Sequence, residues 1–200
     1  MKNTHEYYQS ILFELITHTS VLFTILQTLS HSHPQAYLSA GVLRNMVWTY
    51  YLHGQSFELN NSDIDVIYHH ALEINHNRQS TLQQELARLF PEQQWDVVNQ
   101  ALVHTWYCKE NGERIQPLAS IEHALLLWPD TATAIAVRLN VSGELELIAP
   151  FGLQDLFELK LRWNPALVSY ATFKDRVAAK QWLQQWPKLQ LVDPPIKPKI

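Results

Sequence analysis

The chain has 200 residues, of which 46% are hydrophobic and 17% are charged, and it contains only five glycines. This composition excludes a disordered chain, and the length predicts one compact domain over residues 1–200. The net charge of -4 gives no bulk positive field, so we do not expect long nucleic acid as a partner. Cys108 is the only cysteine, which excludes an intrachain disulfide and indicates a reducing compartment, the cytoplasm.

The N-terminal pattern is helical. Apolar residues recur at near-helical spacing over 6–30, which predicts one or two helices. Glu14 and His18 interrupt the apolar run and no signal-peptide pattern precedes it, so we expect a segment packed on the core and no membrane association. The short apolar run 36–41 predicts a strand that turns directly into a helix over 42–54.

Strand-like and helix-like patterns are intermingled in the rest of the chain. In chain order we expect a strand over 62–70, a helix over 80–90, a strand over 94–100, a helix over 121–128, a hairpin over 131–149, and helices over 152–161 and 170–186. The proline-rich ending predicts a loose tail over 191–200. This order predicts an α+β fold, a small mixed sheet flanked by helices.

Two aspartates stand at the start of the apolar strand in "NNSDIDVIYHH". Because side chains alternate along a strand, Asp63 and Asp65 project from the same face, with α-carbons roughly 6.5 to 7 Å apart. Two carboxylates so placed can converge on one hard cation, Mg²⁺ or Mn²⁺, that also binds phosphate oxygens. The alternative interpretation of this pair alone is a solvated strand end.

The upstream stretch "YLSAGVLRNMVW" offers a place for phosphate. A strand that passes through Ser39, Ala40 and Gly41 straight into a helix exposes backbone N–H groups at the helix N-terminus. Arg44 lies in the first turns, where a guanidinium can pair with phosphate oxygens. A tight turn with Arg44 in a surface ion pair is the alternative.

The two motifs in this order resemble the nucleotidyltransferase superfamily, which includes DNA polymerase β, CCA-adding enzymes and antibiotic nucleotidyltransferases. "AGVLRN" at 40–45 is similar to the Gly-Gly-x-Val-Arg-Asp element of the CCA-adding group, with Gly41 at the second glycine and Arg44 at the arginine. Ala40 replaces the first glycine and Asn45 replaces the aspartate. Residues 35–190 as a whole resemble an uncharacterised bacterial nucleotidyltransferase-like family.

The resemblance implies a third carboxylate on a neighbouring strand, for which Asp96 in "QWDVVNQ" is the candidate. It further implies that Asp63, Asp65 and Asp96 are the catalytic and metal-binding residues. The nucleotide phosphates would lie at Ser39, Ala40, Gly41, Arg44 and Asn45. The implied reaction is magnesium-dependent transfer of a nucleoside monophosphate from an NTP to an unidentified acceptor hydroxyl.

Two alternatives remain beside this hypothesis. The departures at Ala40 and Asn45 motivate a catalytically inactive member that binds a nucleotide or a partner in the same cleft. A metal-dependent phosphohydrolase is the other, because similar carboxylates can activate water.

Several further side chains have an interpretation from their context. The apolar surroundings of Trp48, Trp106, Trp128 and Trp182 predict core positions, and Cys108 is expected to be a packed thiol. Thr131 and Thr133 are expected to start a strand. Arg138 is left open between a triphosphate and a carboxylate as its partner.

Overall fold

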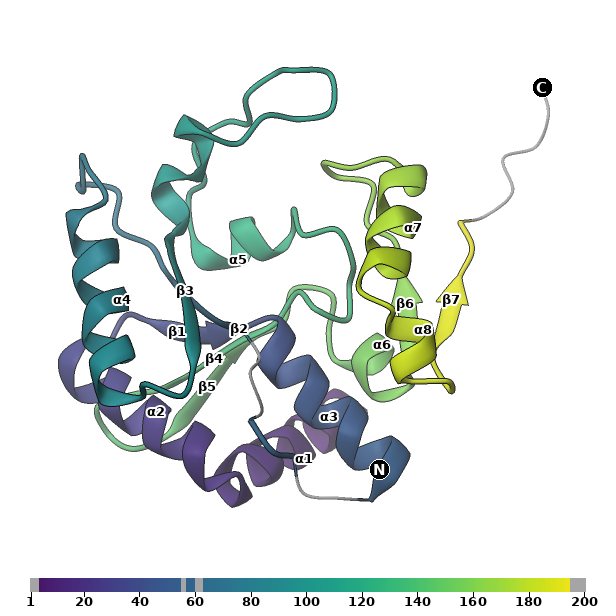
Figure 1. Ribbon diagram of the computed structural model, residues 1–200, viewed down its shortest axis with the longest axis horizontal. Coiled ribbons are helices and arrows are strands. Elements are labelled where there is room, and N and C mark those ends of the chain that lie inside the picture. Colours follow the sequence, from purple (N-terminus) through teal and green to yellow (C-terminus); the bar gives the residue numbers. More distant parts are fainter. Residues whose placement is uncertain (1–3, 55–56, 60–62, 195–200) are drawn as a thin grey trace.

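The computed structural model describes residues 4–54, 57–59 and 63–194. Its centre is a five-stranded mixed sheet with the order β3-β2-β1-β4-β5, flanked by helices (Figure 1). The strands of this sheet are β1 (Tyr37–Ser39), β2 (Asp63–Tyr68), β3 (Gln94–Asn99), β4 (Ala136–Leu139) and β5 (Leu145–Ile148). The predicted α+β class with a small mixed sheet is confirmed.

The strand pairing follows from the lengths of the connections. β2 and β3 are parallel and joined by helix α4 (Asn77–Leu89), whereas β1 pairs antiparallel with both β2 and β4. Parallel neighbours need a long crossover, which α4 supplies. β4 and β5 form the predicted hairpin, whose turn is closed by Gly143 at a φ of 81°. Ser62, predicted to open the strand β2, lies outside the described residues.

The two faces of the sheet carry different residues. On one face, Leu38, Ile64, Val66, Val97 and Val137 are fully buried in the main hydrophobic core. The residues that alternate with them, among them both aspartates of β2 and Asp96 of β3, project from the other face. Helix α5 (Ile121–Leu125) covers part of that second face, where it packs in a smaller apolar cluster. The alternation therefore places the acidic residues opposite the main core.

The N-terminal segment forms two helices, α1 (Thr4–His18) and α2 (Ser20–Ser32), on the core side of the sheet (Figure 1). Leu12, Ile16, Ile25 and Leu26 have no exposed surface, so these helices belong to the core, as predicted. Within the described ranges no single helix has the length and hydropathy to span a membrane. Only α1 and α2 taken together meet that test, and they are bent by 94°.

Helix α3 (Gly41–His53) follows β1 after one residue and ends at Gly54, as expected. After β3 the chain makes a short 3-10 helix, η1 (Gln100–Thr105), and a loop leads to α5. The predicted helix over 121–128 is limited to α5. Its N-terminus is capped by the Ser120 hydroxyl oxygen, which accepts a hydrogen bond from the His123 backbone at 3.0 Å.

The C-terminal quarter differs from the prediction. The helix expected over 152–161 is a single turn, α6 (Gln154–Phe157), followed by strand β6 (Lys160–Arg162). The helix expected over 170–186 is two helices, α7 (Tyr170–Ala179) and α8 (Trp182–Gln185), because Gln181 takes a positive φ of 53°. Strand β7 (Gln190–Val192) pairs in parallel with β6, so Leu191 and Val192 do not belong to a loose tail. Residues 195–200 of that predicted tail lie outside the described residues.

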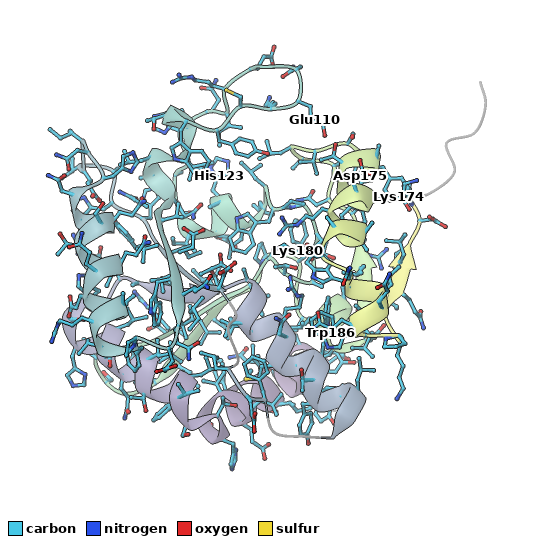
Figure 2. All side chains as sticks on the ribbon, in the orientation of Figure 1. Glu110, His123, Lys174, Asp175, Lys180 and Trp186 are labelled. Atoms are coloured by element: carbon cyan, nitrogen blue, oxygen red, sulfur yellow. The ribbon has the colours of Figure 1, made fainter. Side chains whose placement is uncertain are left out.

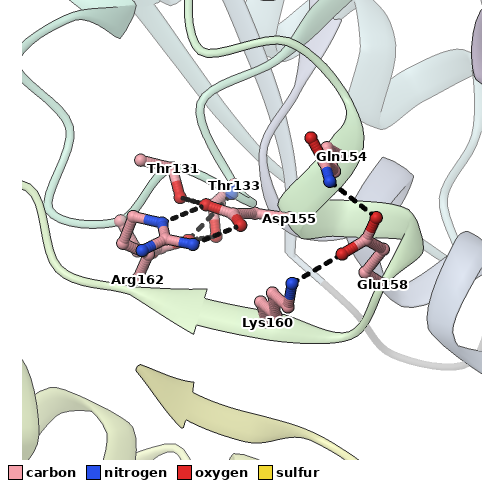
Figure 3. Close-up of polar contacts among 8 residues, drawn as sticks. Thr131, Thr133, Gln154, Asp155, Glu158, Lys160 and Arg162 are labelled. Atoms are coloured by element: carbon pink, nitrogen blue, oxygen red, sulfur yellow. Dashed lines mark hydrogen bonds and ion pairs between the residues drawn. The ribbon is translucent and has the colours of Figure 1, made fainter. Parts of the chain in front are cut away.

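Hydrogen bonds and an ion pair connect β6 to the segment that precedes β4 (Figure 3). Asp155 accepts hydrogen bonds from Thr131 Oγ1 at 2.6 Å and from Arg162 Nε at 2.8 Å and Nη2 at 3.1 Å. Burial alone would raise the pKa of Asp155, but the hydrogen bonds from Arg162 and Thr131 outweigh it and lower that pKa. The network fixes residues 130–133, which border the candidate site.

Candidate active site

The three predicted carboxylates lie on one face of the sheet. In the parallel pairing of β2 and β3, Asp65 is the direct partner of Asp96, and Asp63 lies two residues before Asp65 on the same face. All three line one cavity of about 730 Å³ between the sheet, η1, α5 and the α7–α8 segment. The register of two neighbouring strands therefore brings together residues that are 31 positions apart in the chain.

Burial and neighbouring charges raise the pKa of Asp65 and of Asp96. The pKa of Asp65 is raised to about 6, chiefly by burial, and repulsion from Asp96 and Asp63 adds to this effect. A hydrogen bond from the Gly41 backbone and the positive charge of Arg44 lower the pKa and partly offset the increase. Burial and the charge of Asp63 also raise the pKa of Asp96. A cation between these groups would relieve the repulsion.

The donor set suits a hard cation. Carboxylate oxygens are the ligands that Mg²⁺ and Mn²⁺ prefer, and Mg²⁺ in particular is commonly held by one or two carboxylates together with water and substrate phosphates. In the part of the chain that the structure describes, no three His, Cys, Asp or Glu side chains are already gathered as a complete metal-binding group. Asp63 and Asp65 could supply two carboxylate ligands, and water and phosphate oxygens could complete the coordination of such an ion.

In the turn before α3, Ala40 adopts a backbone conformation that is usual only for glycine. Ala40 has φ 54° and ψ -121°, a conformation that L-residues rarely adopt. The next residue, Gly41, lies between the two charged groups of the site: a methyl group on it would be 3.6 Å from Arg44 Nη2 and 3.7 Å from Asp65 Oδ2. The turn thus brings the backbone close to Asp65, to which Gly41 donates its hydrogen bond.

The predicted phosphate-binding residues are not equivalent in the structure. Ala40, Gly41, Arg44 and Asn45 line the cavity. Ser39 has no exposed surface, and its hydroxyl donates to the backbone oxygen of Asp65 at 3.3 Å, so it is not available to a phosphate.

Arg44 is buried and held on several sides. Its Nε and Nη2 donate to Asn45 Oδ1, its Nη1 donates to Thr133 Oγ1 at 3.2 Å, and its guanidinium lies 4.3 Å from the ring centre of Trp182 and 5.1 Å from that of Trp48. Burial lowers the pKa of Arg44 to about 10, although the charge of nearby Asp130 raises it. The surface ion pair considered for Arg44 is therefore not what the structure shows.

The far wall of the cavity carries cations that the sequence patterns did not indicate. Arg176 and Lys180 of the α7 segment line the cavity together with Gln185 and Trp186. Both cations are exposed, and neither has an ion-pair or hydrogen-bond partner among the described residues. Figure 2 shows Lys180 on the side of this segment that faces the middle of the molecule, with Lys174 and Asp175 toward the outside. Arg176 and Lys180 are four residues apart, so they share one face of the helix. The sequence alone does not show whether that face borders a cavity or solvent.

Some side-chain expectations are wrong. Trp48 and Trp182 are buried, but Trp106 is 56% exposed and, like the half-buried Trp128, it lines the cavity. Cys108 is exposed, because the loop after η1 leaves the core there. Thr131 and Thr133 do not start a strand, because β4 begins only at Ala136; Thr133 lines the cavity and accepts a hydrogen bond from Arg44. Arg138 is paired with Glu146 at 2.6 Å, which settles its partner as a carboxylate.

Residues 28–191 match a protein family described as Nucleotidyltransferase. The chain belongs to this nucleotidyltransferase family. The matched segment reaches from α2 to β7, so both walls of the cavity lie within it. Among proteins of curated function, none matches the sequence.

Solved structures support the nucleotidyltransferase fold. An NMR structure reported to reveal a CCA-adding enzyme head domain is 24% identical, with a TM-score of 0.75, and the match covers 92% of this chain and 95% of the other. A CCA-adding enzyme in complex with CTP is 17% identical with a TM-score of 0.56, covering 91% and 43%. The Thermotoga maritima CCA-adding enzyme complexed with tRNA is 15% identical with a TM-score of 0.54, covering 91% and 42%. This nucleotidyltransferase thus spans less than half the length of the two enzymes.

Proposed function

We propose that this chain is a magnesium-dependent nucleotidyltransferase that transfers a nucleoside monophosphate from an NTP to an acceptor hydroxyl. The observation that carries the proposal is one cavity with opposite charges on its two sides. Asp63, Asp65 and Asp96 line the sheet side, and the cations Arg176 and Lys180, which have no ion-pair partner among the described residues, line the α7 side. A metal-bound triphosphate is complementary to both sides, because the metal satisfies the carboxylates and the phosphate oxygens satisfy the cations.

Asp63 and Asp65 would hold Mg²⁺ or Mn²⁺. When bound, the metal would neutralise the negative charge of the phosphates. Arg176 and Lys180 would orient the triphosphate from the opposite side, and the buried Arg44 would add positive charge near Asp65. Gly41 leaves the backbone of the α3 turn open to the triphosphate. Positioning and charge stabilisation supply most of the catalysis in phosphoryl transfer, so this division of roles is sufficient.

Asp96 would serve as the base. Its raised pKa brings its proton affinity closer to that needed at neutral pH. The proton of the acceptor hydroxyl moves to Asp96 while the acceptor oxygen forms a bond to the α-phosphorus. The bond from that phosphorus to the bridging oxygen breaks, and pyrophosphate leaves with the electron pair. The acceptor therefore enters the cavity on the Asp96 side.

Calorimetric titration of Mg²⁺ and each NTP into wild type and the double variant Asp63→Asn/Asp65→Asn tests the binding step. We expect wild type to bind at least one NTP and the double variant to lose at least about tenfold in affinity. The variant Glu14→Gln/Glu92→Gln removes two charges at exposed positions outside the cavity and is the matched control. Equal affinities in all three proteins would refute the assignment.

Product analysis separates transfer from the two alternatives. Purified protein is incubated with Mg²⁺, labelled NTPs and cell extract, and nucleotidylated species are sought by mass. Release of pyrophosphate together with a nucleotidylated product supports transfer, whereas nucleotide release without such a product indicates hydrolysis. NTP binding with neither product favours the inactive binding member.

A further inference from the structure

The cavity has an apolar end that the reaction described above does not use. It is lined by Ile67 and Val98 of the sheet and by Trp106, Leu118, Trp128 and Leu167, and this set is called the apolar end. Leu118 packs with Ile115 and Ala124 in a small hydrophobic cluster of its own, against which Leu167 also lies. The apolar end is therefore a formed wall with its own core behind it.

The apolar end continues directly from the carboxylates. Ile67 follows Asp65 by two residues on β2, and Val98 follows Asp96 by two residues on β3, so each pair shares a face of its strand. Along each strand, the α-carbon of the apolar residue lies about 7 Å from that of the aspartate. Ile67 is buried beneath α5, whereas Val98 is only partly buried, so a hydroxyl beside Asp96 is then attached to a molecule whose body lies over Val98.

The cations that line the cavity come from α3 and the α7 segment, namely Arg44, Arg176 and Lys180. Among the described residues, no Lys or Arg of β2, β3, η1 or α5 lines the cavity. A polynucleotide acceptor would place its own phosphates there without a cationic partner, which is costly. Charge therefore divides the cavity into a place for the triphosphate and a place for an uncharged body.

The apolar end is also bounded by a contact between its two walls. The Ser169 backbone N–H, at the start of α7, donates to Glu110 Oε1 at 2.9 Å, and Glu110 lies in the loop that follows Trp106. Figure 2 shows Glu110 on the side of this loop that is turned toward α7. The hydrogen bond connects the segment of Trp106 with the segment of Leu167, so the two sides of the apolar end are joined to each other.

We propose, on the basis of the proposed function, that the acceptor is a small molecule with an apolar, ring-containing body that carries the reacting hydroxyl. The body packs between Val98 and the tryptophans of the apolar end, and the hydroxyl reaches Asp96. The exposed indole of Trp106, which contacts Tyr107 edge to face with 6.1 Å between ring centres, supplies a flat surface for the ring.

The probe for this inference is 2-(2-naphthyl)ethanol, titrated into ¹⁵N-labelled protein while the indole N–H resonances are followed by NMR. We expect saturable shifts of the Trp106 and Trp128 resonances, and we expect them to persist when Mg²⁺ and α,β-methylene-ATP are saturating. Ribose, a polyol without an apolar body, should shift neither resonance. Trp106→Ala should weaken binding of the probe roughly tenfold. Tyr7→Ala, at a similarly exposed aromatic outside the cavity, should leave it unchanged.

Two results would overturn this inference and leave the proposed function intact. Competition between α,β-methylene-ATP and the probe would show that the apolar end takes the nucleobase. NTP binding without any saturable shift by the probe would show that there is no acceptor site of this kind. Absence of Mg²⁺-NTP binding in calorimetry would instead overturn the proposed function, and this inference with it.

Discussion

Arg44 donates two hydrogen bonds to the same side-chain oxygen of Asn45, from Nε at 3.2 Å and from Nη2 at 2.9 Å. An amide is a neutral acceptor, so the guanidinium keeps a charge that no carboxylate neutralises by direct hydrogen bonding. A pKa of about 10 leaves Arg44 protonated at neutral pH. Asn45 stands where the Gly-Gly-x-Val-Arg-Asp element has aspartate. It nevertheless holds Arg44 in place by hydrogen bonds and leaves the positive charge of Arg44 acting on the cavity.

Asn45→Asp should stabilise the protein. The oxygen already contacts the guanidinium, and a carboxylate in its place forms charge-assisted hydrogen bonds worth about 1 to 2 kcal/mol more. Asn45→Ala should destabilise by about 1 to 3 kcal/mol, because the donors of Arg44 lose a buried acceptor. Urea unfolding of the three proteins measures both changes. A larger loss in Asn45→Asp than in Asn45→Ala would mean that repulsion by the neighbouring aspartates dominates.

Ala40→Gly should also stabilise the protein. At φ 54° and ψ -121° an alanine is strained and a glycine is not, so relief of about 1 kcal/mol is expected. The same substitution at Ala87, exposed on α4, should destabilise by about 0.5 to 1 kcal/mol, because glycine is a poor helix former. Opposite signs in the two variants, measured by thermal unfolding, verify the strain. A loss at both positions would contradict it.

Asp65→Asn should change how stability depends on pH. The pKa of Asp65 is about 6 in the folded protein and 3.8 in its ordinary state, so between these values the folded state retains a proton that the unfolded chain loses. Stability therefore falls as pH rises through this window, by up to about 3 kcal/mol. In EDTA the variant should be more stable than wild type at pH 7.5 and no more stable at pH 3.5. Asp175→Asn, exposed on α7, is the control. A difference independent of pH would disprove the shift.

Binding of Mg²⁺ should weaken below about pH 6. A carboxyl must lose its proton to bind the metal, and half of the Asp65 carboxyls are protonated near its pKa of about 6. Calorimetric titrations of Mg²⁺ with an NTP in buffers of different ionisation enthalpy should show proton release at pH 6 and little at pH 8. Affinity that is constant from pH 5 to 8 would argue against Asp65 as a ligand.

Arg176→Ala and Lys180→Ala should each reduce NTP affinity about three- to tenfold and lower its dependence on salt, because each removes a cation that faces the cavity. Lys174→Ala removes the same charge from α7, but Lys174 lies over the Tyr170 ring and does not line the cavity. The NTP affinity of Lys174→Ala should equal that of wild type. Equal losses in all three variants would indicate a general charge effect and no contact with the triphosphate.

Local patterns were sufficient for the part of the site that lies on the strands. Alternation along β2 and β3 predicts which residues share a face, and the short turn before α3 predicts the place of Gly41 and Arg44. The hairpin β4–β5 follows from its turn in the same way. These features depend on neighbours within a few residues, so a single sequence contains the information.

Features that depend on distant contacts were missed. The break at Gln181 and the pairing of β6 with β7 are fixed by the packing of the C-terminal segment on the rest of the fold, in which Leu161 and Trp182 are buried. Arg176 and Lys180 resemble an ordinary solvated helix face until that segment is placed. The buried hydroxyl of Ser39 likewise depends on its pairing with β2. The extent of the single domain over 1–200 stays a prediction.

Trp182 contacts two arginines from distant parts of the chain: Arg44 of α3 lies 4.3 Å from its ring centre and Arg176 of α7 lies 5.7 Å from it. The C-terminal helices are thus a structural support for the buried guanidinium of the site. A chain shortened before α7 would lose a wall of the cavity and would also open Arg44 to water. In relatives of this family, we expect exchanges at the position of Trp182 to be accompanied by exchanges at the positions of both arginines.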